Sequence, residues 1–278
     1  MLALEAAEAA AGVLAGCLIA SLLPRRWALA LARPALRAMR LGAGLAHAVA
    51  AAPAGPAAAA ASLARVERAA FLETLGVISI AVFLHGMQHW VRALFVLGAL
   101  LGGTGITYSL LLLAIALARL GTVCALCRLH LRPATSEAAA TLHAVATERR
   151  LVETLKAAIR PAVTVAVAVL AIGTALDYIA PLLPGLVPPW LAIAGVHAAS
   201  AYAAYGVAST MLVSGIVTPR EALRALLLGT ALSSLVGGWR RLFPQLLPLG
   251  VRRATQLTVA NQGLYAALAL AAALMPFC

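Results

Sequence analysis

The chain has 278 residues, of which 63% are hydrophobic and only 11% are charged. Soluble domains average about 45–50% apolar and about 25% charged residues, so one buried core cannot absorb this apolar excess. The composition excludes an ordinary soluble domain and predicts a multi-pass protein of the cell membrane, with the lipid bilayer as its main partner. The net charge is +12, and its arginines fall between apolar segments, as in cytoplasmic loops that meet anionic headgroups. We expect no nucleic-acid binding, because no aromatic-basic surface or known binding module accompanies the charge.

The first segments combine apolar and basic stretches. Ala6–Pro24 is long enough to cross, and its leading acidic residues argue against a cleavable signal peptide, so we predict a retained membrane helix. Within Trp27–Ala61, the helical spacing of Arg33, Arg37 and Arg40 fits an amphipathic interfacial helix. The Ala-, Gly- and Pro-rich remainder of this stretch favours a short, broken or re-entrant crossing.

The middle of the chain alternates apolar runs with polar interruptions. Ala69–Leu84 is apolar, and the polar run His85–Trp90 is interpreted as a hairpin. Ala93–Leu120 is apolar again, with a Gly-Gly-Thr-Gly interruption at Gly102–Gly105, and fits either a helix preceded by a hairpin or one long interrupted span. Arg119–Arg160 is the clearly polar region and predicts a cytoplasmic helix-loop between two halves.

The last part of the chain predicts further crossings. Pro161–Leu183 and Trp190–Ser214 are each long and apolar enough to span. Thr218–Glu221 is a helix start, with Thr at the cap, Pro at the first position and Glu in the first turn. The Ser-Ser and Gly-Gly pairs within Ser233–Gly238 predict a helix broken at bilayer depth, which is tolerated only where protein or water receives the unwound backbone.

The two halves have a similar layout. A shift of 154 residues aligns Glu67 with Glu221 and Ser79 with Ser233. Transporters are often built from such repeats, with the site where the repeats meet. The sequence therefore predicts an all-α polytopic membrane protein with about eight membrane segments in two related halves, some of them broken or re-entrant. The expected division is an N-terminal membrane half at 1–120, a polar linker helix at 121–160 and a C-terminal membrane half at 161–278.

Four stretches of the C-terminal half carry a resemblance: Thr174–Pro184, Trp190–Ala204, Ser209–Leu235 and Trp239–Thr258. They resemble the archaeal and bacterial membrane proteins classed as nucleoside-recognition, or Gate, domain proteins. The resemblance implies a helical repeat protein related to the gating segments of ferrous-iron transporter B, spore-maturation proteins and concentrative nucleoside transporters. It makes a nucleoside the first candidate solute. A complete iron transporter is not expected, because the chain has no Gly-x-x-x-x-Gly-Lys-Ser/Thr loop.

The motifs predict no catalytic or metal site. Paired carboxylates, His-Glu-x-x-His and a serine with a matched base are lacking, so we expect no enzyme. Cys124, Cys127 and His130 have the spacing of half a zinc site without a second pair, and His85 and His89 lack an evident third ligand. No cofactor or metal is expected.

We therefore expect a transporter or channel-like permeation component for a small polar solute. The alternative is a non-catalytic scaffold or accessory subunit that binds a partner through its basic loops, and assembly as a homo-oligomer is left open. The candidate solute-binding residues are Ser79, Asp177, His197, Ser200, Ser233, Ser234, Gly237, Gly238, Asn261 and Gln262.

Each candidate also has a purely structural interpretation. Asp177 fits a helix end near the outer interface as well as an interior site. His197 is a histidine that a neighbouring helix can bond, and the serine and glycine pairs suit close helix packing. Asn261 and Gln262 point to different sides of a helix, so one is expected to pack while the other faces the site.

Overall fold

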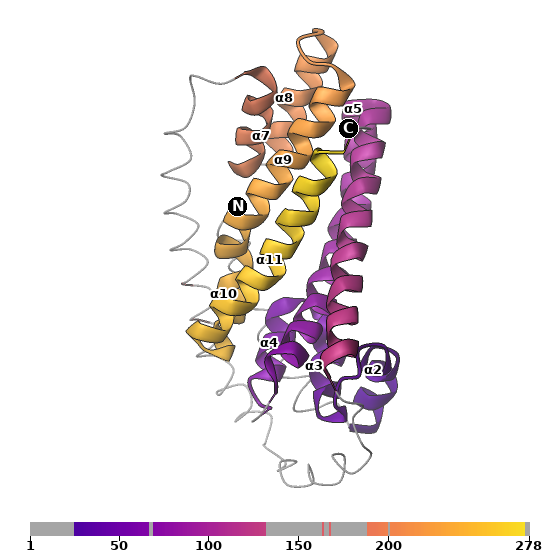
Figure 1. Ribbon diagram of the computed structural model, residues 1–278, viewed down its shortest axis with the longest axis vertical. Helices are drawn as coiled ribbons and strands as arrows, with labels where there is room; N and C mark the ends of the chain where they lie inside the picture. The colour runs from indigo at the N-terminus through magenta and orange to yellow at the C-terminus, as the bar shows by residue number, and fades with distance from the viewer. Residues whose placement is uncertain are drawn as a thin grey trace. The chain divides into compact units, whose positions relative to one another are not determined.

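The structure is a computed structural model that describes residues 25–66, 69–131, 163, 167, 188–199 and 201–275. These residues are mostly helical and contain no strand, which confirms the all-α prediction (Figure 1). They form two compact units. Unit 1 comprises 25–66, 69–85, 120–131, 163, 167 and 241–257, and unit 2 comprises 86–119, 188–199, 201–240 and 258–275. Each unit combines residues from the first half of the chain with residues from the second half. The expected division at 1–120, 121–160 and 161–278 stays a prediction.

Unit 1 begins with an amphipathic helix, α2 (Arg25–Met39). Ala32, Leu36 and Met39 are buried, whereas Arg33 and Arg37 are exposed. Positions 32, 36 and 39 follow the spacing of one helical face, so the apolar face packs inward and the arginines face outward. The arginine spacing predicted this outward face for Arg33 and Arg37, whereas Arg40 lies beyond the end of the helix, with φ 54°.

The Ala-rich stretch that follows is a series of short helices. They are η1 (Ala43–Leu45), α3 (Ala46–Ala51), η2 (Ala52–Ala54) and α4 (Pro56–Leu63). Gly55 separates the last two with φ 107°, a conformation that favours glycine. All eight residues of α4 are buried, and α4 packs against α10 (Phe243–Leu246) and η6 (Leu247–Leu249). Helices this short cannot cross a bilayer, so the stretch is broken in the way that its Gly and Pro content suggested.

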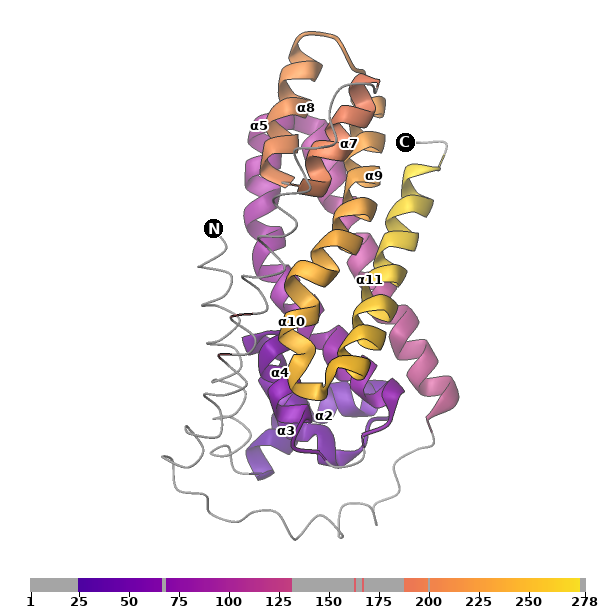
Figure 2. The ribbon, with the colours of Figure 1, turned by 90° about the vertical axis from the view of Figure 1, so that its left-hand side faces the viewer.

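Helix α5 (Phe71–His130) covers 60 residues but is a helical hairpin. A straight helix would separate Trp90 and Ser109 by about 28 Å. Instead, Trp90 Nε1 donates to the Ser109 carbonyl at 2.7 Å. In unit 1, Cys127 Sγ lies 3.5 Å from the Leu72 carbonyl oxygen. The ribbon of α5 accordingly turns back on itself in Figures 1 and 2.

The hairpin turns at Gly102, which has φ 55° and ψ −133°. Only glycine adopts this combination readily. The hairpin also requires glycine at position 105, because a Cβ at this position would collide with the Leu97 carbonyl of the opposite arm. The hairpin predicted at His85–Trp90 is therefore wrong: those residues lie within the helix, and the glycine run forms the turn.

The described residues of unit 2 comprise the part of that hairpin from Gly86 to Arg119 and four further helices. These are α7 (Pro189–Ala199), α8 (Ala201–Val213), α9 (Pro219–Gly237) and the part of α11 (Val251–Ala273) from Thr258 onward. Trp190–Ser214, expected as one crossing, thus contains two helices that pack against each other. The predicted start of α9 is confirmed: the Glu221 N–H donates to Thr218 Oγ1 at 3.2 Å, and the Thr218 N–H donates to Glu221 Oε2 at 2.8 Å.

The helix break predicted within Ser233–Gly238 is wrong. Helix α9 continues through Ser233 and Ser234 to Gly237 and passes into a π-helical turn, η5 (Gly238–Leu242). Ser233 Oγ and Ser234 Oγ donate to the Thr230 and Ala231 carbonyls at 3.1 and 2.8 Å. Hydroxyls bonded to their own helix leave its backbone ladder intact.

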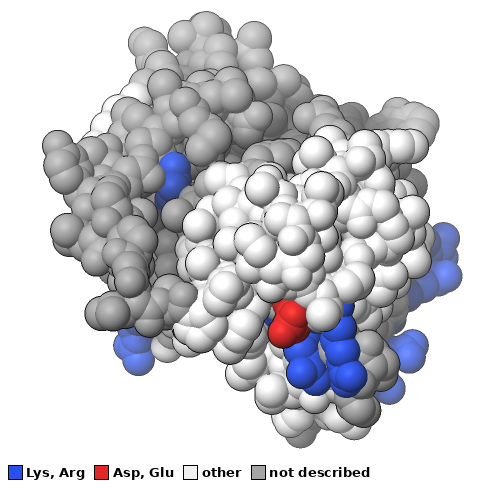
Figure 3. Space-filling model, turned by 90° about the horizontal axis from the view of Figure 1, so that it is seen from above, with Lys and Arg blue, Asp and Glu red and all other residues white. Residues whose placement is uncertain are grey.

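Among the residues that the structure describes, two helical stretches are long and apolar enough to cross a membrane, Leu94–His130 and Pro219–Leu249. Of the most apolar window of Leu94–His130, 22% is buried, so most of that window is not covered by the described residues. Large apolar residues are exposed along it, including Phe95, Leu100, Ile106, Leu110 and Leu117. Lys, Arg, Asp and Glu are sparse on the described surface seen in Figure 3.

Candidate functional site

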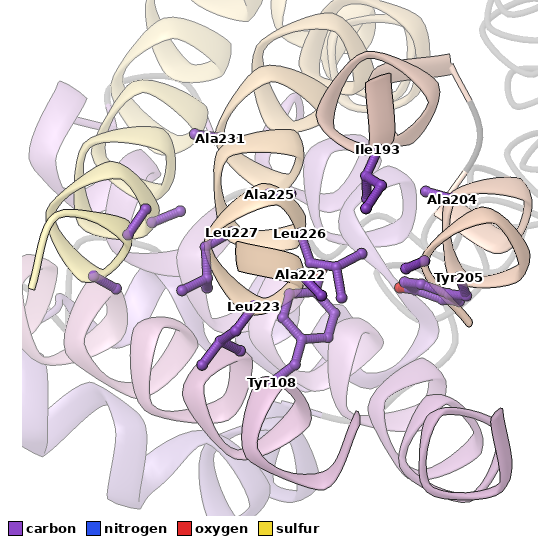
Figure 4. Packing of buried hydrophobic residues seen from close by; sticks show 14 of the residues in the cluster. Tyr108, Ile193, Ala204, Tyr205, Ala222, Leu223, Ala225, Leu226, Leu227 and Ala231 are labelled. Atoms are coloured by element: carbon purple, nitrogen blue, oxygen red, sulfur yellow. The ribbon is translucent and has the colours of Figure 1, made fainter. Parts of the chain in front are cut away.

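A chain of hydrogen bonds inside unit 2 joins three helices at Tyr108. This tyrosine is fully buried in the second arm of α5. Its hydroxyl lies 2.9 Å from His197 Nε2 on α7 and 2.6 Å from Thr230 Oγ1 on α9. Apolar side chains surround it, and Figure 4 shows Tyr108 directed toward Leu226 and Ala222 of α9.

Two arrangements of the hydrogens fit these distances. If Thr230 Oγ1 donates to the Leu226 carbonyl at 2.9 Å, it accepts from Tyr108, whose oxygen then accepts from His197 Nε2–H. If Thr230 donates to Tyr108 instead, Tyr108 donates to His197 Nε2 and the imidazole carries its hydrogen on Nδ1. A neutral imidazole with its hydrogen on Nε2 has a lone pair on Nδ1. That Nδ1 is buried and has no hydrogen-bond partner.

Aromatic rings enclose one side of this junction. Tyr205 of α8 lies edge-to-face with both Tyr108 and His197, with centroids 6.1 and 5.7 Å apart. Such pairs stabilise beyond their buried area by about 0.5–1.5 kcal/mol. The three rings therefore hold the junction in one geometry.

Gly229 brings α9 close enough to α7 for the junction to form. A Cβ at Gly229 would lie 2.5 Å from His197 Cβ and 3.1 Å from the Ala194 carbonyl oxygen. Any larger residue would force the two helices apart. The glycine thus sets the distance at which Tyr108 can reach His197 and Thr230 together.

A second polar cluster in unit 2 surrounds Arg119. The guanidinium is 4% exposed, and its Nη1 donates to Asn261 Oδ1 of α11 at 3.0 Å. The Tyr265 ring lies 5.1 Å from the guanidinium carbon, within cation–π range. Asn261 and Tyr265 are four residues apart and share one face of α11, so that face receives the arginine.

The structure brings only some of the predicted site residues to these clusters. His197 and Asn261 are buried in unit 2 and belong to them. Ser79 is buried in unit 1, whereas Ser233 belongs to unit 2. Asp177 and Ser200 lie outside the described residues.

Of the predicted site residues Gly237, Gly238 and Gln262, the last two pack against each other and Gly237 borders open space. A Cβ at Gly238 would lie 2.8 Å from Gln262 Cγ, so these two residues form a close contact between η5 and α11. A Cβ at Gly237 would meet nothing within 4 Å. Gly238 therefore acts in helix packing, and Gln262 lies against it while Asn261 faces Arg119.

The sequence reasoning missed Tyr108, Arg119, Thr230 and Tyr265. Arg119 was assigned to the start of the polar linker, although it is surrounded by apolar residues on both sides. A lone arginine in such a run is the signal that could have identified it. The partners of Tyr108 lie 89 and 122 residues away, and no local spacing reveals such pairs.

The two cysteines that have the spacing of half a zinc site donate to backbone carbonyls. Cys124 Sγ lies 3.3 Å from the Ala38 carbonyl oxygen, and Cys127 Sγ bonds Leu72 as described above. Among the residues that the structure places, no three of His, Cys, Asp and Glu gather as metal ligands would.

The part of the chain that the structure describes is helical, with two stretches long and apolar enough to cross a membrane and with polar clusters buried in unit 2. No family model, curated protein or solved structure matches the chain.

Proposed function

We propose that this chain is a multi-pass integral membrane protein that acts as a transporter or channel-like permeation component for a small polar solute. The observation that carries the proposal is the Tyr108–His197–Thr230 hydrogen-bond chain inside an apolar core. Polar groups at membrane depth are costly, and a buried network of them is a candidate solute or proton pathway as well as a means of joining helices.

The exposed apolar side chains support a membrane location. The arm of α5 from Gly103 to His130 extends about 42 Å, enough for a hydrocarbon core of about 30 Å. Its exposed side chains are mostly apolar, among them Ile106, Leu110 and Leu117, and lipid solvates such side chains better than water does. The proposal includes about eight membrane segments in two related halves, as the sequence predicts.

The junction residues have the chemistry to exchange partners with a solute. Tyr108 and Thr230 hydroxyls both donate and accept hydrogen bonds, and His197 Nδ1, which is buried without a partner, can form one with a solute hydroxyl or amide. The Tyr205 ring offers a face to a planar group. A nucleoside has both features and is the first solute to test, by family resemblance.

The test is uptake into liposomes that contain the purified full-length chain. Thr230→Val removes the hydroxyl from Tyr108, and Thr210→Val is its matched control. Both threonine hydroxyls lie within hydrogen-bond distance of the carbonyl four residues earlier, at 2.9 Å for Thr230 and 3.1 Å for Thr210, but Thr210 is exposed. We expect Thr230→Val to reduce nucleoside uptake about tenfold, the effect of losing one hydrogen bond of about 1.4 kcal/mol, and Thr210→Val to leave it unchanged.

The proposal is rejected if protein-containing liposomes take up nucleosides, metal ions and organic ions no faster than empty ones. Co-purification of a stoichiometric partner together with that result would favour the scaffold function. If both threonine variants transport equally well, the Tyr108 junction is not on the path.

A further inference from the structure

Arg119 is a buried cation, and the described residues of unit 2 place no counter-charge beside it. Glu221 provides the one carboxylate among the residues of unit 2 that the structure describes. It is exposed and accepts hydrogen bonds from Thr218 at the start of α9. The charge on Arg119 is therefore not neutralised by the side chains described around it.

The partners that Arg119 does have are neutral. Asn261 accepts one hydrogen bond, and the Tyr265 ring contributes the attraction of its face. The Nε–H is buried and has no acceptor. In a guanidinium, Nε–H and a neighbouring Nη–H form the edge that binds a carboxylate or phosphate through two parallel hydrogen bonds. The edge that includes Nε is the one that the described residues leave without an acceptor.

A further donor is available on the same helix as Asn261. Thr258 is 2% exposed, and its Oγ1 is buried without a hydrogen-bond partner. Thr258, Asn261 and Tyr265 are spaced three and four residues apart, so all three side chains lie on one face of α11. Arg119 Nε and Thr258 Oγ1 are two of the five buried side-chain atoms without a hydrogen-bond partner among the described residues of unit 2, and an acceptor that the chain does not itself supply would suit both.

We infer that unit 2 binds an oxyanion, a carboxylate or phosphate group, at the Nε edge of Arg119. This inference rests on the proposed function, because the anion must reach a site inside the membrane-embedded unit. It specifies the solute class: an anionic solute, such as a phosphorylated nucleoside or an organic acid, neutralises Arg119, whereas a neutral nucleoside does not. The same group could also come from a lipid phosphate.

The first experiment measures thermal unfolding of the full-length chain in alkyl maltoside micelles, whose head groups carry neither phosphate nor carboxylate. Sodium phosphate and sodium acetate are each compared with sodium chloride at matched ionic strength. At a hundred times the Kd, we expect phosphate or acetate to raise the Tm by roughly 5–10 °C. Arg119→Gln should abolish the rise. Arg128→Gln, which removes an exposed charge from the same helix, should retain it.

Arg119→Lys is the second variant, and it keeps the charge near the site. Lysine cannot form the bidentate pair, so the Kd for phosphate should rise about tenfold or more. If Arg119→Gln does not fold, the wild-type titration and Arg119→Lys still decide the question. An anion effect that is the same in Arg119→Lys and wild type overturns the inference.

Phosphatidylglycerol added to the same micelles identifies the source of the oxyanion. A higher wild-type Tm in this lipid, with no further gain from free phosphate and no gain in Arg119→Gln, assigns the site to a lipid headgroup. A wild-type Tm that is indifferent to phosphate, acetate and phosphatidylglycerol overturns the inference, as expected if a carboxylate elsewhere in the chain neutralises Arg119. Uptake into liposomes separates the two proposals. Uptake of neutral nucleosides without anion binding rejects the oxyanion site but not the transport function. Anion binding without any uptake rejects the transport function but not the site.

Discussion

Gly229→Ala should loosen the contact between α7 and α9 on which the Tyr108 junction depends. The new methyl group would lie 2.5 Å from His197 Cβ, whereas ordinary contacts begin at 3.4 Å, so the helices must separate by about 0.9 Å. No rotamer change relieves this clash, because a Cβ moves only with its backbone. Overpacking of this kind costs about 1–3 kcal/mol. Stretching the 2.9 Å bond from Tyr108 to His197 adds about 1 kcal/mol.

The assay is thermal unfolding of the purified full-length chain, followed by tryptophan fluorescence. A loss of this size corresponds to a fall in Tm of roughly 5–10 °C for a chain of this length. Gly237→Ala on the same helix is the matched control, since its methyl group meets nothing within 4 Å. It should leave the Tm unchanged or raise it slightly, because alanine favours helix over glycine by about 1 kcal/mol.

A double-mutant cycle tests the cause of the effect. His197→Gly removes the Cβ that the new methyl group meets, so Gly229→Ala should cost less in that background than in the wild type. If Gly229→Ala is as stable as the wild type, or costs the same in both backgrounds, the close approach of α7 and α9 is not as described.

Three further predictions concern single positions. Gly102→Ala should destabilise the chain by about 1–3 kcal/mol because of its φ of 55°, whereas Gly103→Ala, in equally open space and without positive φ, should be neutral in the same unfolding assay. Tyr108→Phe should cost about 1–3 kcal/mol, since it leaves buried polar atoms unpaired, and an unchanged Tm would contradict the hydrogen-bond chain. Thr218→Ala should cost about 1 kcal/mol by removing the cap of α9, with faster amide exchange confined to its first turn.

Local signals predicted the elements that local physics determines. The cap at Thr218 and the arginine spacing of α2 both follow from interactions within a few residues, and the structure confirms them. The hairpin position was missed because the polar run His85–Trp90 resembled a turn. Its tryptophan finds an acceptor at Ser109 in the opposite arm, and only the backbone of Gly102 requires glycine.

The site was harder to predict than the helices. His197 and Asn261 were identified as polar residues in apolar segments, but their partners Tyr108 and Arg119 were not. Hydrogen bonds between helices depend on which faces meet, and sequence periodicity gives the face of a helix without its neighbour. Ser233 and Ser234 were wrongly predicted to face a solute, although their hydroxyls bond carbonyls of their own helix. The sequence cannot distinguish a serine that bonds its own helix from one that faces a ligand.

The central claim is that unit 2 lies in lipid and gives a solute access to the Tyr108 junction. The most direct measurement is cysteine labelling in intact membranes with a small, charged thiol reagent, after replacement of the four native cysteines. Leu110→Cys, at a position 53% exposed on the apolar face of α5, should not react, and Thr230→Cys should react slowly and be protected by solute. Rapid labelling at Leu110 together with an inert Thr230 would contradict both parts of the claim.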